Sequence, residues 1–284
     1  MDAAVIVEVG PRDGLQNEPG FVATADKLAL IGRLAASGLS RIEATAFVAP
    51  KWVPQMADHD AVMRGVPRRA GLVYSALVPN VQGAAAAIAA GADELAIFTA
   101  ASESFCRRNI NCTIAESLER FRPVMALAAE HGLPVRGYVS CVTDCPYEGA
   151  VAPAAVTRVA LALRDLGCTE IALGETLGRA EPGRVAALVA DVAASLPPER
   201  LAGHFHDTGG QALASIDVCL AHGIRVFDAA AAGLGGCPYA PGAKGNVATG
   251  RVARHLAARG FRTGIDAERL AEAEAFAAAL RGAG

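Results

Sequence analysis

The feature that most constrains the fold is an alternation of short β-rich runs with longer helical segments, which continues from one end of the chain to the other. Glycine or proline precedes nearly all of these runs, at positions where a helix is expected to end. Alternating strands and helices imply a parallel sheet, and eight such units within 284 residues fit a (β/α)8 barrel. The candidate strands are residues 4–9, 41–45, 72–78, 94–98, 135–140, 170–173, 202–206 and 226–230.

An open, doubly wound sheet is the alternative fold. It is disfavoured because the residues after the first run, Gly10 to Gly14, are too few for a dinucleotide-binding glycine motif and include a proline. We therefore expect residues 1–284 to form a single α/β domain, a (β/α)8 TIM barrel. Residues 266–280 are expected to form an extra C-terminal helix that caps or flanks the barrel.

Composition argues against several functional classes. The net charge of −3 gives no basic surface for nucleic acid, and the alanine-rich runs are too short to span a membrane. Seven cysteines include no C-x-x-C pair, so neither a zinc ribbon nor a disulfide framework is expected, and most should be buried. Residues 4–9 already resemble a strand rather than a targeting leader, which favours a cytoplasmic location.

The barrel prediction also indicates which polar side chains should meet. Active sites of such barrels lie at the carboxyl ends of the strands, in the loops that follow them. Side chains that could bind a metal or transfer a proton occupy those positions at most of the candidate strands. They are Arg12, Asp13, Glu43, Thr45, Tyr138, Ser140, Glu175, His204, His206, Cys237 and Asn246.

His204 and His206 are the strongest single signal for a metal. Alternate residues of a strand project on the same side, about 7 Å apart, so two neutral imidazoles could bind one ion. An isolated H-x-H is about as often a pair of core histidines, but this pair ends a strand just before a turn, Asp207 to Gly210. An aspartate, two histidines and an amide oxygen form a mixed set that suits Mg²⁺ or Mn²⁺ better than a thiolate zinc site.

Several segments carry a more specific pattern. Residues 7–18 read VEVGPRDGLQNE and residues 233–240 read GLGGCPYA, with further matches at 47–56, 109–112, 136–141 and 145–149. Over nearly the whole chain these segments resemble the 3-hydroxy-3-methylglutaryl-CoA (HMG-CoA) lyases. The Arg-Asp pair and the H-x-H motif alone mark the wider superfamily of barrel metalloenzymes, which includes isopropylmalate and homocitrate synthases.

The resemblance implies a divalent cation, Mg²⁺ or Mn²⁺, and retro-Claisen cleavage of HMG-CoA into acetyl-CoA and acetoacetate. It also implies a homodimer acting on an acyl-CoA, with a place in leucine degradation. The implied metal ligands are Asp13, His204, His206 and Asn246. The implied catalytic residues are Arg12, which would stabilise the enolate, Cys237 as acid and base in a glycine-rich loop, Glu43 and Glu175. The implied substrate contacts are Arg12, Gln16 and Tyr138.

Three departures from the family pattern concern residues near the predicted site. Glu175 stands where aspartate is common, Gly209 where tyrosine is, and Gly250 where glutamate is. The two glycines are expected to open room near the metal, so a lyase for a bulkier 3-hydroxy-3-alkylglutaryl-CoA is one alternative. A Claisen-type condensing synthase and a non-catalytic metal- or CoA-binding relative are the others.

Overall fold

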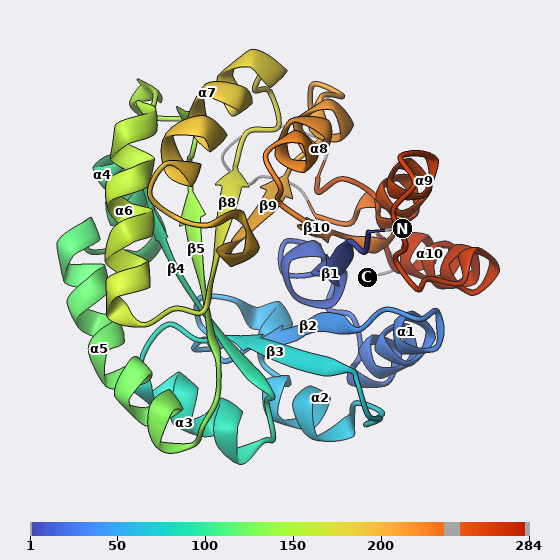
Figure 1. The fold of residues 1–284 in the computed structure, drawn as a ribbon. Helices are drawn as coiled ribbons and strands as arrows, with labels where there is room; N and C mark the ends of the chain where they lie inside the picture. The colour runs from blue at the N-terminus through green and yellow to red at the C-terminus, as the bar shows by residue number, and fades with distance from the viewer. Residues whose placement is uncertain (1, 236–244, 282–284) are drawn as a thin grey trace.

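Eight parallel strands close into a barrel with helices around its outside (Figure 1). The computed structural model describes residues 2–235 and 245–281. Neighbouring strands follow the order β1-β10-β9-β8-β5-β4-β3-β2, and β1 pairs with β2 to close the barrel. Each predicted run supplies one barrel strand, which confirms the TIM barrel. The barrel strands are β1 (Val5–Glu8), β2 (Arg41–Ala46), β3 (Val73–Leu77), β4 (Glu94–Ala100), β5 (Val135–Ser140), β8 (Glu170–Glu175), β9 (Leu201–Phe205) and β10 (Val226–Ala229).

The helices between the strands end where the sequence predicts. Gly167 follows α6 with a φ of 114°, a left-handed conformation that glycine adopts without strain, and the chain turns there into β8. The helices are α1 (Thr24–Ala36), α2 (His59–Gly65), α3 (Val81–Ala89), α4 (Glu103–Ile110), α5 (Ile114–Glu130), α6 (Pro153–Leu166), α7 (Pro182–Ala193), α8 (Ala212–Ala221), α9 (Thr249–Ala258) and α10 (Ala267–Leu280).

The extra C-terminal helix is present and flanks the barrel rather than capping it. Figure 1 shows α10 beside α1 and α9 on the outside of the barrel, and it also contacts the short 3₁₀ turn η4 (Ala231–Gly233) that follows β10. Its N-terminus is capped by Asp266, whose side chain accepts hydrogen bonds from two backbone N–H groups of the first turn. The helix therefore packs next to the loop at the end of the eighth strand.

Two local features were not predicted. Residues Gly10–Gly14 form a π-helical turn after β1, and a small antiparallel hairpin of β6 (Asp144–Cys145) and β7 (Gly149–Ala150) follows β5. The strand β8 also runs two residues further than expected, because Gly174 and Glu175 continue its pairing with β9. Glu175 is thus the last residue of a strand and does not lie in the following loop.

The starts of several strands hold a buried charged cluster inside the barrel. Arg136 donates from Nε to Glu170 Oε1 at 2.6 Å, and Arg41 binds Glu170 at 2.9 Å and Glu94 at 3.2 Å. Pairing is what makes buried charges tolerable, because an isolated one would cost several kcal/mol. The six cysteines of the described residues are buried and free. No helix in the described ranges is long and apolar enough to cross a membrane.

Candidate metal and active site

The π-helical turn after β1 carries Arg12 and Asp13. Within Gly10–Gly14 the backbone N–H of Leu15 donates at 2.9 Å to the carbonyl five residues earlier, the spacing of a π-helix. Arg12 Nη1 donates to Asp13 Oδ1 at 2.6 Å, so the two neighbouring side chains hold one another. Short π-helical insertions occur often at functional sites, because they redirect side chains that a regular turn would not bring together.

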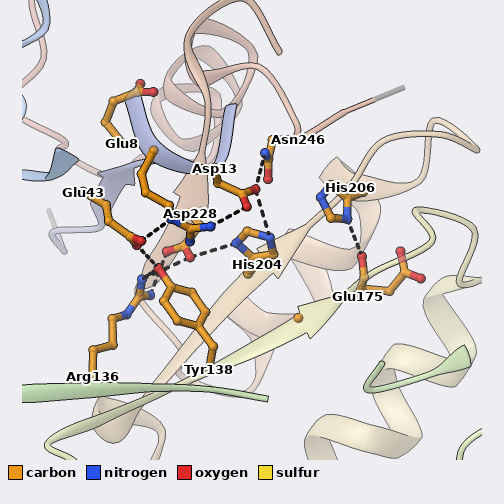
Figure 2. Close-up of polar contacts among 12 residues, drawn as sticks. Glu8, Asp13, Glu43, Arg136, Tyr138, Glu175, His204, His206, Asp228 and Asn246 are labelled. Atoms are coloured by element: carbon orange, nitrogen blue, oxygen red, sulfur yellow. Dashed lines mark hydrogen bonds and ion pairs between the residues drawn. The ribbon is translucent and has the colours of Figure 1, made fainter. Parts of the chain in front are cut away.

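The two histidines at the end of β9 each use Nδ1 within the protein (Figure 2). The Nδ1–H of His204 donates to Asp228 Oδ2 at 2.9 Å, and that of His206 donates to the backbone carbonyl of Glu175 at 3.1 Å. These bonds favour the tautomer in which Nε2 carries the lone pair. Both imidazoles can therefore present Nε2 to a metal ion.

Asp13, His204 and His206 converge on one point. One ligand atom of each lies within 4.8 Å of the others, and Asp13 Oδ2 is 4.0 Å from His204 Nε2. Burial opposes ionisation of Asp13, but Arg12 and the imidazoles lower its pKa to about 2. Burial, with the charge of His204, lowers the pKa of His206 to about 4. Asp13 and His206 are thus deprotonated near neutral pH, as ligands of a divalent cation must be, and a carboxylate with two imidazoles is a donor set that fits such a cation.

Asn246 reaches the same point from the loop after β10. It forms an isolated antiparallel bridge with His206, which ties its backbone to the end of β9. Its Nδ2 donates to Asp13 Oδ2 at 2.8 Å and to the carbonyl of Leu234 at 3.3 Å. The amide nitrogen faces Asp13 here, so a half-turn of the amide would present its oxygen to a metal. Cys237, the predicted acid and base, lies outside the described residues.

Arg12 is held as a permanent buried cation beside Asp13. Its Nε donates to Glu43, whose other carboxylate oxygen accepts from the Tyr138 hydroxyl at 2.5 Å. Burial disfavours the charged form of Arg12, but Glu43 and Asp13 outweigh it and raise the pKa above its usual value. The Glu43 carboxylate therefore joins Arg12 to the Tyr138 hydroxyl.

Gln16 and Glu175 lie at the edges of the site. Gln16, a predicted substrate contact, donates from Nε2 to Asp13 Oδ1 at 2.8 Å, so it supports the candidate ligand Asp13. Figure 2 shows the Glu175 carboxylate turned away from the imidazoles, and it accepts from Thr143 Oγ1 at 3.3 Å. Burial raises the pKa of Glu175. Its backbone carbonyl, rather than its carboxylate, meets His206.

Two charged residues that sequence reasoning did not single out support His204. Asp228 lies opposite His204 in the sheet, and Arg136 binds both of its carboxylate oxygens, at 2.7 and 3.0 Å. Burial opposes ionisation of Asp228, but Arg136 and His204 hold its pKa well below its usual value. Burial also lowers the pKa of His204, yet the bond to Asp228 and nearby negative charge raise it overall. The sequence signal that could have identified Asp228 and Arg136 is a charged residue within an otherwise apolar strand.

Glu8 is a further buried carboxylate, at the end of β1. It accepts hydrogen bonds from the backbone N–H groups of Gly10 and Ala231, each at 2.8 Å, and from the Thr249 hydroxyl at 2.6 Å. Burial outweighs these bonds and raises its pKa to about 7. Glu8 thus joins the π-helical turn to both ends of the loop that carries Asn246.

We expect Glu8 to make stability depend on pH. Its pKa rises from 4.5 to about 7 on folding, so the native state holds a proton in this range that the unfolded chain has released. The contribution is complete below pH 4.5 and is lost as the pH rises through about 7, by roughly 3 kcal/mol. Urea unfolding of the wild type and of Glu8→Gln across this range measures it. Parallel pH profiles for the two proteins would contradict the prediction.

Gly209 and Gly250, which replace larger residues of the family pattern, do not leave empty space in this structure. A Cβ at Gly250 would lie 2.3 Å from Glu274 Oε2, and one at Gly209 would lie 3.2 Å from the carbonyl oxygen of Gly178. The expectation of extra room next to Gly250 is therefore wrong, because a carboxylate from α10 fills that position. At Gly209 the neighbouring backbone approaches closely instead.

Fold and site together define a class of protein: a (β/α)8 barrel with a carboxylate and two histidines that fit a divalent cation at the carboxyl ends of its strands. The model of the HMGL-like family matches residues 3–277. The chain therefore belongs to the HMGL-like family, and it is a carbon–carbon lyase like its relatives that are named hydroxymethylglutaryl-CoA lyases.

Individual relatives agree with this assignment. The chain is 55% identical over 272 residues to the hydroxymethylglutaryl-CoA lyase of Pseudomonas mevalonii, covering 96% of this chain and 90% of that protein. It is 53% identical over 268 residues to the 3-hydroxy-3-isohexenylglutaryl-CoA/hydroxy-methylglutaryl-CoA lyase of Pseudomonas aeruginosa, covering 94% and 89%. The crystal structure of the HMG-CoA lyase from Brucella melitensis matches with a TM-score of 0.97 and 57% identity over 99% of each chain.

Proposed function

We propose that this protein is a divalent-metal-dependent lyase that cleaves HMG-CoA into acetyl-CoA and acetoacetate. The observation that carries the proposal is the convergence of Asp13, His204 and His206 next to the buried, permanently charged Arg12. The names of the relatives supply the substrate, and the cluster supplies a place where its oxygens could be bound. The acyl-CoA would approach from the carboxyl ends of the strands.

Asp13, His204, His206 and Asn246 would hold the metal, Mg²⁺ or Mn²⁺. When bound, such a cation supplies Lewis acidity to the 3-hydroxyl and a neighbouring oxygen of the substrate. Asp228 keeps His204 in the required tautomer, and the backbone carbonyl at the end of β8 does the same for His206. The donor set is of mixed nitrogen and oxygen type, which agrees with these metals.

The chemistry follows a retro-Claisen course. The 3-hydroxyl loses its proton to a base and becomes the ketone of acetoacetate, while the C2–C3 bond breaks and its electron pair moves to the thioester enolate. Arg12, oriented by Glu43, provides a fixed positive charge for that enolate. Cys237 then protonates the enolate carbon to give acetyl-CoA. Gln16 and Tyr138 are proposed to contact substrate, and Glu175 to take part in proton transfer.

Replacing Cys237 by alanine tests the proton-transfer role. Removing a general acid is expected to reduce cleavage by roughly 10²-fold while leaving Mn²⁺ content unchanged, because the thiol is not among the proposed ligands. Acetoacetate formation and metal content measured on one preparation give both quantities. Cys219→Ala, which removes a buried thiol from α8, is the matched control. Unchanged turnover of Cys237→Ala would contradict the role.

A second candidate substrate is a bulkier 3-hydroxy-3-alkylglutaryl-CoA. It is favoured by the relative in Pseudomonas aeruginosa that is named for both an isohexenyl and a methyl substrate. The filled position next to Gly250 argues against an enlarged pocket there. Comparing kcat/KM for HMG-CoA with that for longer 3-alkyl analogues decides between them, and a preference for the longer chains would support the bulkier substrate.

Four further features remain proposals. A homodimer is testable by light scattering, and a cytoplasmic location is testable by cell fractionation. A place in leucine degradation is testable by growth of a deletion strain on leucine. The single domain over residues 1–284 predicts one cooperative unfolding transition.

A further inference from the structure

Glu274 of α10 binds both ends of the loop that follows β10. Its Oε1 accepts a hydrogen bond from the backbone N–H of Ala232 at 3.2 Å and another from that of Gly250 at 2.9 Å. Ala232 lies in η4, and Gly250 lies in the first turn of α9. One side-chain oxygen of the C-terminal helix therefore joins the backbones of Ala232 and Gly250, which are 18 residues apart in the sequence.

Both backbone positions need an outside partner. The N-cap of α9 is Ala248, which has no side chain able to accept from the first-turn N–H groups, so Glu274 performs this task from another helix. Its negative charge also suits the positive end of the helix dipole. Ala232 has a φ of 54°, a left-handed conformation that is unfavourable for alanine and must be held by its surroundings.

A second carboxylate binds the adjacent pair of residues. Glu8 joins the N–H of Ala231 to the Thr249 hydroxyl, just as Glu274 joins Ala232 to Gly250. The two glutamates come from opposite ends of the chain, in β1 and α10. Successive residues of η4 are thus paired with successive residues of α9 through carboxylate oxygens.

Asn246 depends on these paired ends. The N–H of Ala230 donates to the carbonyl of Val247 at 3.1 Å, and the Asn246 side chain donates to the carbonyl of Leu234 at 3.3 Å. Both partners adjoin η4, so a shift of η4 relative to α9 would move the Asn246 amide away from Asp13. The contacts that fix η4 relative to α9 therefore also fix the position of Asn246, the proposed ligand.

We propose that Glu274 is a positioning residue for the lyase reaction: by joining η4 to α9 it keeps Asn246 opposite Asp13. The inference rests on the proposed function only for its kinetic consequence. It makes α10 a structural part of the active site, although the helix lies outside the barrel. Gly250 belongs to the same arrangement, because a Cβ at this position would displace the Glu274 carboxylate.

The test compares Glu274→Ala and Glu274→Gln with Glu272→Ala, an exposed control on the same helix. For Glu274→Ala, hydrogen exchange at Ala232 and Gly250 is expected to rise by about tenfold or more in the metal-free protein, because both N–H groups lose their acceptor. Mn²⁺ affinity and kcat should each fall by about tenfold, with a smaller change in KM. Glu274→Gln should restore most of each loss, because both bonds go to one oxygen that the glutamine amide can replace.

Gly250→Ala approaches the same contact from the other side. It should reduce kcat in the wild-type background and have much less effect in the Glu274→Ala background, where no carboxylate is left to displace. Unchanged exchange and Mn²⁺ affinity in Glu274→Ala, equal effects of Glu272→Ala, or no rescue by glutamine would each overturn the proposal. If the wild type fails to cleave HMG-CoA, the proposed function fails, while exchange and Mn²⁺ affinity still decide the role of Glu274.

Discussion

Replacing Asp13 by alanine is expected to abolish Mn²⁺ binding at micromolar concentrations and to reduce turnover of HMG-CoA on the order of 10⁴-fold. Asp13 is the only carboxylate in the cluster with His204 and His206 among the described residues, and its pKa of about 2 keeps it ionised at any working pH. Without it the site loses its negative ligand while Arg12 keeps its positive charge nearby, so a cation would be repelled. Calorimetric titration with Mn²⁺ and a steady-state assay measure the two effects.

The control is Asp60→Ala, which removes an exposed aspartate paired with Arg64. It should leave Mn²⁺ affinity and turnover unchanged, and circular dichroism should show that both variants keep the fold. Mn²⁺ bound by Asp13→Ala with wild-type affinity would contradict the ligand assignment, whatever happened to turnover.

Replacing Arg12 by glutamine is expected to lower kcat by about 10³-fold, equivalent to roughly 4 kcal/mol of transition-state stabilisation. Glutamine can still donate a hydrogen bond, but it cannot offer the permanent charge that the enolate would need. Mn²⁺ affinity should change by less than about tenfold, because Arg12 is not a ligand and its loss removes a positive charge next to Asp13. The dissociation constant and kcat, measured on the same variant, separate binding from catalysis.

Arg12→Lys refines this test. Lysine keeps the charge but lacks the planar group that binds Glu43 and Asp13 together, so an intermediate kcat is expected. If Arg12→Gln loses Mn²⁺ and kcat in parallel, the arginine supports the metal site and does not stabilise the enolate. That result would contradict its proposed catalytic role.

Most of the barrel was predictable because its determinants are local. A buried parallel strand is a short apolar run, and the glycine that ends the preceding helix lies a few residues before it, as Gly167 does before β8. The hairpin of β6 and β7 was missed because its strands have only two residues each and carry no alternation to detect. The π-helical turn was missed for a related reason, since its five residues also suit an ordinary loop.

The site was predictable only in part. Asp13, His204 and His206 each follow or end a strand, so barrel geometry alone brings them together. Asp228 contacts His204 from the neighbouring strand β10, and Arg136 of β5 acts on His204 through Asp228, so these contacts depend on the register of the strands. The role of Glu274 was harder still to predict. A single glutamate on a helix of mixed composition resembles an exposed residue until the packing of α10 is known.

Gly250 illustrates how a departure from a family pattern can mislead. Read alone, glycine in place of a larger residue indicates a wider pocket. The structure places a carboxylate from α10 where the side chain would have been, so the change is compensated by a residue 24 positions later in the sequence. The room at this position therefore depends on the tertiary contact as well as on the residue type.

The most direct measurement is a steady-state assay of acetoacetate formation from HMG-CoA with Mg²⁺ or Mn²⁺, repeated after treatment with a chelator and after restoring the metal. We predict cleavage that disappears with the chelator and returns with Mn²⁺, because Asp13, His204 and His206 would hold the cation that supplies Lewis acidity to the substrate oxygens. Cleavage that persists in the chelator at full rate would contradict the metal-dependent mechanism. No cleavage of HMG-CoA under any of these conditions would contradict the assigned reaction itself.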